Sequence, residues 1–547
     1  MNKAMVCRIR QKLFFGALGC IALLMSVVSN AWAESSHLTA QGGIANEYDY
    51  QEYVFLTGTP VLMKGKFKVS ISPGRGDTTT TKFTYTLADD GGTNKLSRSL
   101  TFVEVSSERE DKSQAVRTSQ IDKFSETVQL NGVKYQLDDY RLNKSQIVDR
   151  HPVVNYYSGN WEGRKIYSVN KTAGRLVVDV SGNTVGYDHN WGRSETQRMT
   201  QILQYTPSTT GSSTTNSATN LTSAWDGQVD YTVNLSTDRQ FVYQGNDPVN
   251  ISFSGGYLIN ELGDSSILAD YDLPNNNDNA RRNRGNLQWA LQSAPKVARM
   301  YVPAYEDIRD HWAQADIERL AGLKAWGSQS GFFGPTQPIT RLDFTCAFVR
   351  ALGVLSPDGP TGMIAYTAGY PNLPPPGEKQ TAKRATTATS TAGYNGATGA
   401  PRTKNKGETE RAPFVDLTSQ SDGYAEVKLA YEKGIMTGTS VTRFDPYGLM
   451  TREQAATLIV RGLGLATMAP SGQSPLPFYD DGQISPWARD SVYVAQELGI
   501  VAGDSYGYFR PGDIITRAEA ATMLMKSIDF LENTMKQDYR DRLMNMH

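Results

Sequence analysis

Residues 509–519 read FRPGDIITRAE, and the same pattern occurs twice earlier, as FDPYGLMTREQ at residues 444–454 and FGPTQPITRLD at residues 333–343. A short segment of the form aromatic–any–aspartate opens each copy further upstream, at residues 478–480, 414–416 and 305–307. Such self-similarity indicates one supersecondary unit used several times, because a single unit cannot bury its apolar face alone. The C-terminal part of the chain is therefore predicted to contain three copies of one unit.

Each copy is predicted to form a helix, a loop and a second helix. In the third copy, the apolar residues between Trp487 and Leu498 recur at intervals that fit one helix face, and Gly499 is a stop signal. Behind each threonine–arginine box, apolar residues recur with helical spacing and predict a buried stripe. These stripe residues are Phe344, Ala347, Phe348 and Leu352; Ala455, Leu458, Ile459 and Leu463; Ala520, Met523, Leu524 and Ile528.

The second helix of each copy begins with a predicted capping box. In such a box, the threonine side chain and the residue three positions later satisfy backbone N–H groups that the helix itself leaves without partners. The pairs are Thr516 with Glu519, Thr451 with Gln454, and Thr340 with Asp343. The pair of the first copy fits less well, because aspartate is shorter than glutamate.

The arginine after each capping threonine is not required by the helix. Arg341, Arg452 and Arg517 stand at the first helical position, where a positive side chain opposes the helix dipole. An arginine beside free helix-terminal N–H groups is suited to binding a carboxylate or a phosphate. A solvated arginine that pairs with an acid is the alternative for a single copy. The recurrence in three copies favours an anion site.

The repeat resembles the S-layer homology domain, whose best-known signature is the TRAE-type box, and the resemblance covers about residues 301–530. It implies an all-α, pseudo-threefold prism of helix–loop–helix repeats. It also implies that grooves between repeats bind an anionic wall polymer, typically a secondary wall polysaccharide that carries pyruvate ketals. In this resemblance the arginine grips the ketal carboxylate, while the opening aspartate and the helix tryptophan shape the groove. The implied polysaccharide-binding residues are Arg341, Arg452, Arg517, Asp307, Asp416, Asp480, Trp312 and Trp487.

The three copies depart from one another in two places. The second copy has Asp422 where the others have tryptophan, so its groove is expected to lack that ring. The first copy has Lys324 and Ser328 where the third has glycine, which predicts a different turn after its first helix. For the two tryptophans, core packing is the alternative interpretation.

The spacing of the arginines exposes an insertion. Arg452 and Arg517 are 65 residues apart, whereas Arg341 and Arg452 are 111 apart, an excess of 46. The excess falls in residues 355–412, which are rich in Thr, Ala, Gly and Pro and cannot bury enough apolar surface to order themselves. This segment is predicted to be a flexible insertion.

Residues 1–33 have the features of a secretory signal peptide. Four positive residues precede an apolar stretch at residues 13–28, and Ala-Trp-Ala at residues 31–33 is a cleavage site. The mature chain is expected to be secreted and to lack a membrane span. After cleavage Cys346 is the remaining cysteine, so no intrachain disulfide is expected.

Residues 34–286 are predicted to be β-rich. Apolar and polar residues alternate through much of this region, and Asn131-Gly132 between two alternating runs predicts a hairpin with a type I′ turn. We expect an antiparallel fold, either sandwich-like or an elongated assembly of strands. An alternative divides the region into two subdomains at the Ser/Thr-rich segment 206–223.

The sequence gives little sign of catalysis or of a cofactor. It has no paired histidines with zinc spacing and no phosphate-binding loop, and its net charge of −1 does not suggest nucleic acid as a partner. Asp270, Asp272 and Asp278 could hold calcium, although a solvated turn is the simpler interpretation. The cluster at residues 187–191 could stack on a sugar or pack at a strand end. No catalytic residue, metal or cofactor is predicted.

The predicted function is non-covalent anchoring of a secreted β-rich protein to the bacterial cell wall, as an S-layer or surface-display component without enzymatic activity. A wall-anchored enzyme acting on polysaccharide and an envelope tether that binds peptidoglycan are the alternatives. Self-assembly into a surface lattice is a further expectation. The predicted segments are the signal peptide (1–33), β-region (34–286), connector (287–300), repeat 1 (301–354), insertion (355–412), repeat 2 (413–466), repeat 3 (477–530) and C-terminal tail (531–547).

Overall fold

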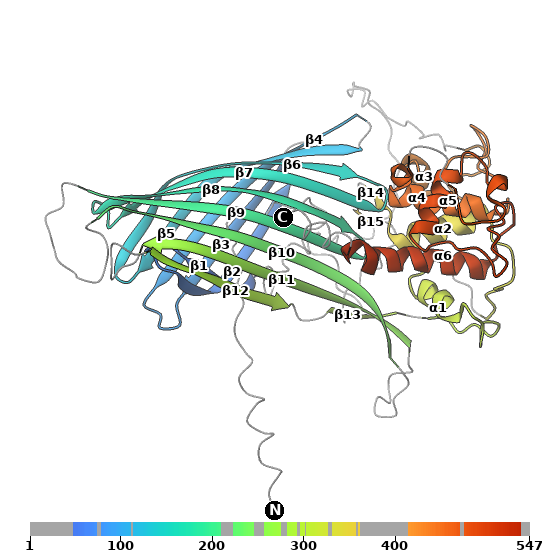
Figure 1. Cartoon of the computed structure of the whole chain (residues 1–547), viewed down its shortest axis with the longest axis horizontal. Coiled ribbons are helices and arrows are strands. Elements are labelled where there is room, and N and C mark those ends of the chain that lie inside the picture. Colours follow the sequence, from blue (N-terminus) through green and yellow to red (C-terminus); the bar gives the residue numbers. More distant parts are fainter. Residues whose placement is uncertain are drawn as a thin grey trace, which may run out of the picture.

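The computed structural model consists of a curved β-sheet with a helical part at one end of it (Figure 1). It describes residues 47–537 except for eleven gaps: 74–77, 111–112, 209–222, 245–255, 275–281, 293–295, 301, 327–330, 357–358, 361–413 and 471–474. The predicted signal peptide, most of the predicted insertion and residues 538–547 of the predicted tail lie outside the described residues.

The β-region forms one 13-stranded antiparallel sheet in which each strand from β1 to β12 pairs with the next along the chain, while β13 pairs with β11. The strands are β1 (Glu47–Val54), β2 (Val61–Pro73), β3 (Thr78–Ala88), β4 (Lys95–Glu108), β5 (Gln114–Leu130), β6 (Val133–Arg150), β7 (Val154–Val169), β8 (Gly174–His189), β9 (Gly192–Pro207), β10 (Trp225–Gln244), β11 (Gly256–Pro274), β12 (Arg282–Gln292) and β13 (Lys296–Arg299). The antiparallel, β-rich prediction is confirmed, and the strands continue through most of the predicted connector.

The sandwich-like part of the prediction is wrong, because the described strands of this region belong to one sheet instead of two facing sheets. The alternation of buried and exposed residues is correct; in β6 it runs through nearly the whole strand. The sheet also does not divide at residues 206–223. Strands β9 and β10 flank that segment and pair directly, from Tyr205 opposite Trp225 to Gly192 opposite Asp238.

The sheet curves strongly enough for its first strand to approach its last strands (Figure 1). The ring of Phe55, just after β1, lies 6.1 Å from the ring of Tyr231 in β10 and 6.2 Å from that of Tyr271 in β11. Register shifts at Thr101/Phe102 and Leu137/Asp139 add bends to the normal strand twist. The concave face therefore encloses its own apolar core.

The predicted hairpin is present at the turn between β5 and β6. Leu130 pairs with Val133, and both turn residues have positive φ, +50° at Asn131 and +80° at Gly132. These are the angles that a type I′ turn requires and that asparagine and glycine tolerate. The local sequence signal was sufficient here.

A buried ionic network links four strands inside the curved sheet. Arg98 in β4 donates to Glu52 in β1, at 2.8 and 3.0 Å, and to Glu126 in β5, at 3.0 Å. Lys165 in β7 donates to Glu126 at 2.9 Å. Burial alone would raise the pKa of Glu126, but Arg98 and Lys165 outweigh it and lower that pKa to about 2. The strands are thus joined by charges as well as by apolar contacts.

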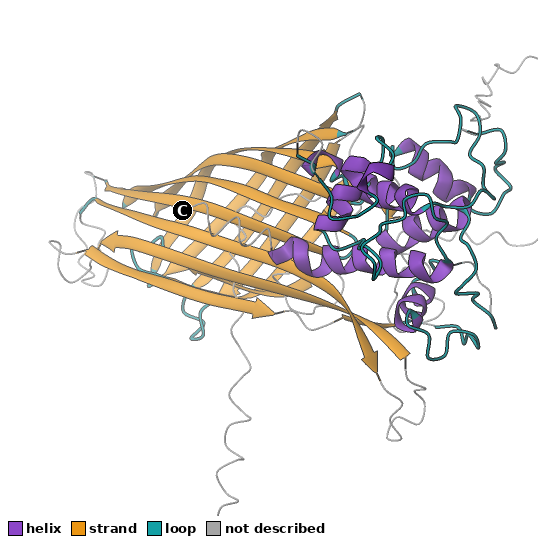
Figure 2. Cartoon of the chain, turned by 45° about the vertical axis from the view of Figure 1, so that its right-hand side comes forward, coloured by secondary structure: helices purple, strands orange, loops and turns teal. Residues whose placement is uncertain are grey.

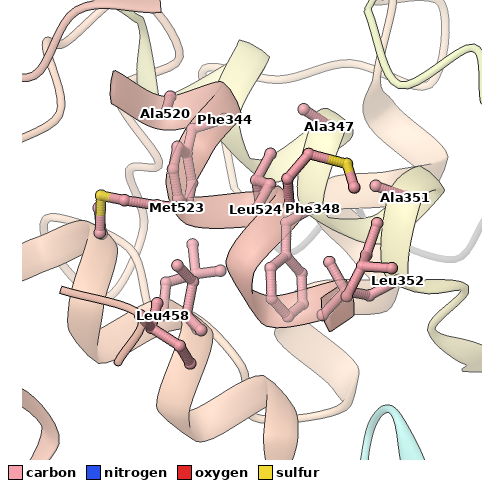
Figure 3. Packing of buried hydrophobic residues seen from close by; sticks show 14 of the residues in the cluster. Phe344, Ala347, Phe348, Ala351, Leu352, Leu458, Ala520, Met523 and Leu524 are labelled. Atoms are coloured by element: carbon pink, nitrogen blue, oxygen red, sulfur yellow. The ribbon is translucent and has the colours of Figure 1, made fainter. Parts of the chain in front are cut away.

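The helical part consists of short helices connected by long loops (Figure 2). Its elements are α1 (Gln314–Gly322), α2 (Arg341–Leu352), the two-stranded β14 (Leu355–Ser356) and β15 (Gly359–Pro360), α3 (Tyr424–Glu432), α4 (Arg452–Leu463), η2 (Ala466–Met468), η3 (Asp481–Gln483), α5 (Arg489–Glu497), α6 (Arg517–Asp529) and η4 (Phe530–Thr534). Helices α2, α4 and α6 begin at the three arginines, as the boxes predict. Their predicted stripes are buried and pack together in one core (Figure 3).

The three capping threonines are also in place. The side chains of Thr340, Thr451 and Thr516 each accept a hydrogen bond from the backbone N–H three residues later. In α4 and α6 the reciprocal bond from the N-cap N–H to the side chain of Gln454 or Glu519 completes the box. The prediction that the box of the first copy fits less well than the other two is confirmed.

The predicted difference in the first-copy turn is wrong. Lys324 adopts a left-handed φ of +57°, close to the values of +68° at Gly434 and +69° at Gly499. The turn hydrogen bonds are also equivalent, with the Lys324 N–H donating to Ala321 O at 2.9 Å and the Gly499 N–H to Gln496 O at 2.9 Å. The surrounding repeat therefore imposes on lysine a conformation that usually favours glycine. Ser328 lies outside the described residues.

The helical part packs against one end of the sheet (Figures 1 and 2). Trp191, between β8 and β9, is 2% exposed and donates from Nε1 to Ala351 O in α2 at 3.1 Å. Lys536, beyond η4, pairs with Asp238 in β10. Packing at a strand end is thus the role of Trp191 in the cluster at residues 187–191. The sheet and the helical part share an interface.

Two further side chains bear on the remaining predictions. Burial raises the pKa of the Cys346 thiol to about 12, so it stays protonated near neutral pH. The Asp272 carboxylate, a candidate calcium ligand, accepts hydrogen bonds from Arg282 and Arg284 instead. Among the residues that the structure describes, no group of three or more His, Cys, Asp or Glu side chains could hold a metal ion. Asp278 lies in one of the gaps.

None of the helices in the described ranges is both long and apolar enough to cross a bilayer.

Candidate functional site

The loops in front of α2, α4 and α6 meet in a closed ring of backbone hydrogen bonds. The N–H of Met450 donates to Ile339 O at 3.1 Å, that of Ile515 to Met450 O at 3.0 Å, and that of Ile339 to Ile515 O at 3.1 Å. Each copy therefore contacts both others directly. This ring fixes the positions of the three helix starts relative to one another.

The first N–H groups of these helices are occupied by carbonyl groups of a neighbouring copy. The Arg341 N–H donates to Gly448 O at 2.8 Å, the Arg452 N–H to Asp513 O at 3.0 Å, and the Arg517 N–H to Gln337 O at 2.8 Å. The next N–H in each helix donates in the same way. The expectation of free helix-terminal N–H groups is therefore wrong. An anion at these sites would have to be bound by side chains.

Each arginine side chain packs over the phenylalanine side chain of another copy: copy 1 over copy 2, copy 2 over copy 3, and copy 3 over copy 1. The guanidinium of Arg341 lies 5.4 Å from the ring centroid of Phe444, and that of Arg452 lies 5.4 Å from Phe509. Arg517 lies 4.5 Å from Phe333. These distances are in the range of cation–π contacts. Three equivalent inter-copy sites result, each formed by an arginine of one copy and a phenylalanine of the next, and these are the candidate binding grooves that the resemblance implies.

Arg341 differs from the other two in its hydrogen bonds. It is 8% exposed, and its guanidinium donates to Phe444 O at 3.1 Å and to Thr437 O at 3.0 Å. Two backbone carbonyls thus hold this side chain against the second copy. Its donors are largely used within the protein.

Arg452 and Arg517 keep more of their donors available. Arg452 donates to Ala502 O at 2.9 Å, and its nearest paired carboxylate, Glu519, is 3.7 Å away. Within the described residues Arg517 makes no hydrogen bond through its side chain, and its paired carboxylate, Asp343, is 3.8 Å away. These separations exceed normal hydrogen-bond length. Both side chains keep about a fifth of their surface exposed, 21% and 20%.

Burial acts on both of these arginines. It lowers the pKa of Arg452 and of Arg517, and the nearby carboxylates, Glu519 and Asp343 among them, offset this only in part. A guanidinium that is mostly desolvated and has no carboxylate within hydrogen-bond distance gains strongly from an added anion. The two sites therefore have the chemistry of carboxylate or phosphate receptors.

The three opening aspartates hold the loops on which the arginines pack. Asp307 accepts from the N–H groups of Phe333 and Gly334, at 2.8 and 2.7 Å. Burial would raise the pKa of Asp307, but these two N–H groups outweigh it and lower that pKa. The equivalent pairs are Phe444 and Asp445 on Asp416, and Phe509 and Arg510 on Asp480. The aspartates position the groove loops through the backbone.

The two tryptophans lie on the surface. Trp312 is 66% exposed and Trp487 is 51% exposed, which excludes the core-packing alternative for both. The rings that contact the arginines are instead Phe333, Phe444, Phe509 and, for Arg517, also Trp326. Sequence reasoning treated these phenylalanines as part of the repeat and gave them no role in the site. In every copy this phenylalanine stands eight residues before the arginine in the sequence. That constant spacing was the signal that could have identified the phenylalanines.

Residues 413–456 and 477–521 match the family model described as the S-layer homology domain. These two segments are S-layer homology domains. They contain Arg452 and Arg517, whose paired carboxylates lie 3.7 and 3.8 Å away. The first copy lies outside the matched residues, although the backbone N–H of its arginine and the carboxylate of its aspartate make contacts equivalent to theirs.

The curated relatives include both enzymes and surface-layer proteins. An endoglucanase of Bacillus sp. (strain KSM-635) is 33% identical over 141 residues, which are 26% of this chain and 14% of that protein. An amylopullulanase of Thermoanaerobacterium thermosulfurigenes is 27% identical over 227 residues, 41% of this chain and 9% of that protein. The surface-layer 125 kDa protein of Lysinibacillus sphaericus is 28% identical over 129 residues, 23% of this chain and 10% of that protein. The chain thus spans less than a fifth of each.

The S-layer homology domains and the surface-layer relatives indicate a secreted surface protein associated with the cell wall. They support cell-wall anchoring of a surface protein.

Proposed function

We propose that the helical part anchors the β-region to the cell wall by binding an anionic, carboxylate-bearing wall polysaccharide in the grooves of Arg452 and Arg517. The observation that carries this proposal is that both guanidinium groups are mostly buried and have their paired carboxylates at 3.7 and 3.8 Å, beyond hydrogen-bond distance. A ketal carboxylate of a pyruvylated polysaccharide has the planar geometry that a guanidinium binds through two hydrogen bonds. Two grooves on one rigid unit also add avidity.

The same proposal gives the third groove a different role. Arg341 donates to two carbonyls and is buried, so in this account it joins the first two copies and contributes little to polymer binding. Residues 301–354 are then a third S-layer homology repeat, and the three repeats form the pseudo-threefold prism that the resemblance implies. Support comes from the closed hydrogen-bond ring of Ile339, Met450 and Ile515.

The experiment that tests the anchor is a pull-down of the full mature chain on purified cell-wall sacculi, before and after hydrofluoric acid removes the attached polymer. Binding is expected to disappear with the polymer. Binding that survives removal would instead support a tether that binds peptidoglycan. Absence of binding to untreated sacculi would make the repeats an assembly device between subunits and would contradict the anchor.

Two variants assayed in the same pull-down test whether Arg452 and Arg517 are the residues that bind the polymer. Replacing Arg452 and Arg517 together by alanine is expected to remove most of the retention on untreated sacculi, because each charge-assisted pair contributes about 1.5–3 kcal/mol. Arg461→Ala is the matched control, since it removes one positive charge from the same helix α4 outside the groove contacts. Unchanged retention of the double variant would refute the role given to the two arginines.

A wall-anchored enzyme is the second candidate, because relatives named endoglucanase and amylopullulanase match this chain. In that case the β-region would carry the activity. Incubation of the purified chain with cellulose and with pullulan tests this candidate, and release of reducing sugar would establish it. We expect no release, because buried carboxylates such as Glu126 and Glu195 are engaged in ion pairs within the sheet.

A further inference from the structure

The third copy carries three exposed tyrosines, Tyr479 in its opening segment and Tyr506 and Tyr508 in the loop after α5. Tyr479 is 81% exposed, Tyr506 73% and Tyr508 41%. The rings of Tyr479 and Tyr508 lie 5.7 Å apart between centroids, at an interplanar angle of 57°. We call these two residues the aromatic platform. So much exposed aromatic surface in one place usually marks a binding site.

The platform is held in place by the loop beneath it. The Asp504 carboxylate accepts from the N–H groups of Tyr506 and Tyr508, at 2.9 and 3.0 Å, and pairs with Arg510 at 2.7 Å. The Arg510 guanidinium in turn lies 5.7 Å from the centroid of the Tyr508 ring. One carboxylate thus organises the backbone and the flanking side chain of Tyr508. The ring is positioned before any ligand arrives, which lowers the entropic cost of binding.

Gly507 fixes the other ring. The Tyr479 N–H donates to Gly507 O at 3.0 Å, and Gly507 has a φ of +81°. A Cβ at this position would lie 2.9 Å from the Tyr479 ring, so the ring rests directly on the glycine backbone. Both the positive φ and the close approach of the ring require glycine here.

Tyr508 of the platform belongs to the loop that contacts Arg452. Phe509, the ring under the Arg452 guanidinium, directly follows Tyr508 in the chain. Ala502 O, which accepts from Arg452, belongs to the same loop. An anion bound by Arg452 and a group placed on the platform would therefore be neighbours along one ligand.

The other two copies lack this platform. The N–H of Val415 donates to Thr442 O, and that of Glu306 donates to Gly331 O, which makes Val415 and Glu306 the counterparts of Tyr479. The counterparts of Tyr508, one position before the groove phenylalanine, are Arg443 and Phe332. Within the described residues, the paired tyrosines occur at the Arg452 groove alone.

We propose that Tyr479 and Tyr508 form a sugar-stacking subsite for the residue that follows, in the polysaccharide chain, the carboxylate-bearing residue bound by Arg452. The C–H face of a pyranose ring packs against aromatic rings, and Arg510 and Asp504 lie beside Tyr508 to hydrogen-bond its hydroxyl groups. The positive charges of Arg452 and Arg510 suit an anionic chain better than a neutral one. This inference rests on the proposed function and adds a second ligand residue to it.

The test uses the full mature chain and wall polysaccharide released from sacculi by hydrofluoric acid, with affinity measured by titration calorimetry. Tyr479→Ala and Tyr508→Ala are each expected to weaken binding about tenfold, the change that corresponds to about 1.4 kcal/mol for one aromatic contact. Tyr479→Phe and Tyr508→Phe are expected to bind like the parent protein, because stacking needs the ring and not the hydroxyl. Tyr506→Ala is the matched control on the same loop and should leave affinity unchanged.

The outcomes separate this inference from the proposed function. If Arg452→Ala weakens binding but both tyrosine-to-alanine variants bind normally, the subsite is refuted and the anchor stands. If Arg452→Ala has no effect, the polymer-binding role of Arg452, on which the subsite rests, is refuted, while the sacculi pull-down still decides the anchor. If the phenylalanine variants bind as weakly as the alanine variants, the hydroxyl groups act and stacking is refuted. Circular dichroism of each variant, compared with that of the parent protein, confirms that the loss is not one of folding.

Discussion

The sheet and the helical part both bury arginines, but they provide different partners for them. Inside the sheet, Arg98 donates to two carboxylates, Glu52 and Glu126, at 2.8 to 3.0 Å. In the helical part, Arg517 has a single paired carboxylate, at 3.8 Å. A buried charge that is paired with carboxylates at hydrogen-bond distance has a structural role, whereas a desolvated guanidinium with a more distant partner gains free energy from a bound anion.

Within the helical part, the three repeat arginines also differ in how far their hydrogen-bond donors are satisfied by the protein. Arg341 uses its donors on two backbone carbonyls, which makes it similar to Arg98 in being satisfied within the protein. Arg452 and Arg517 occupy equivalent positions and are not satisfied to the same degree. Sequence position alone therefore does not decide which repeat can bind a ligand; the partners supplied by the next copy do.

The largest effect is expected from the paired charges of the sheet. Glu126→Gln removes the carboxylate shared by Arg98 and Lys165 and leaves two buried positive charges with fewer partners. Breaking a buried ion pair by removing one member costs about 3–5 kcal/mol. We expect the free energy of unfolding in urea, followed by near-ultraviolet circular dichroism of the tyrosines, to fall by that amount.

Asp179→Asn is the matched control for this prediction. It breaks an ion pair with Arg164 on the exposed side of the sheet, where solvent screens the charges. The unfolding free energy of this variant is expected to stay close to that of the parent protein. Equal stability of Glu126→Gln and the parent would contradict the structural role of the network.

A smaller effect is expected from the aspartates that hold the groove loops. Asp480→Ala leaves the N–H groups of Phe509 and Arg510 without their acceptor, which costs about 2–3 kcal/mol for buried groups. The variant should also lose polymer binding, because Phe509 supports Arg452. Asp480→Asn keeps one acceptor oxygen, so it is expected to lose less stability and less affinity for the polymer than Asp480→Ala. A stable variant with normal binding would show that the loop does not depend on Asp480.

A further expected effect concerns pH and the interface between the two parts. Burial raises the pKa of Glu532 to about 8, and Asp529 adds to the rise while Arg319 opposes it. The folded protein therefore keeps a proton that the unfolded chain loses near its ordinary pKa of 4.5, so stability decreases as the pH rises from about 4.5 through about 8. Glu532→Gln should reduce the difference in unfolding free energy between pH 5 and pH 9. An undiminished difference would assign that pH dependence to other groups.

The parts of the fold that depend on neighbours in sequence were predictable. The capping boxes, the buried stripes and the Asn131-Gly132 hairpin are each set by a few adjacent residues, and all are present. The curvature of the sheet was not predictable, because it depends on contacts such as that between Phe55 and Tyr231, which lie far apart in the chain. Alternation specifies a strand and its faces but not how many strands share one sheet.

The positions of the three arginines at the helix starts were predictable, but their environment was not. The N–H groups at the helix starts looked free because their acceptors, such as Gly448 and Asp513, belong to the next copy. Lys324 looked incompatible with the turn because its conformation is imposed by the repeat around it. In both cases a tertiary contact overrides a local rule.

The central claim is that the arginines with distant carboxylates bind the polymer, whereas the satisfied arginine holds the protein together. The most direct measurement compares Arg341→Ala, Arg452→Ala and Arg517→Ala, each assayed for affinity towards released wall polysaccharide and for unfolding free energy. We expect Arg452→Ala and Arg517→Ala to lose about tenfold or more in affinity with little change in stability. Arg341→Ala should lose stability and, while folded, keep its affinity. Equal losses of affinity in all three variants would contradict the account.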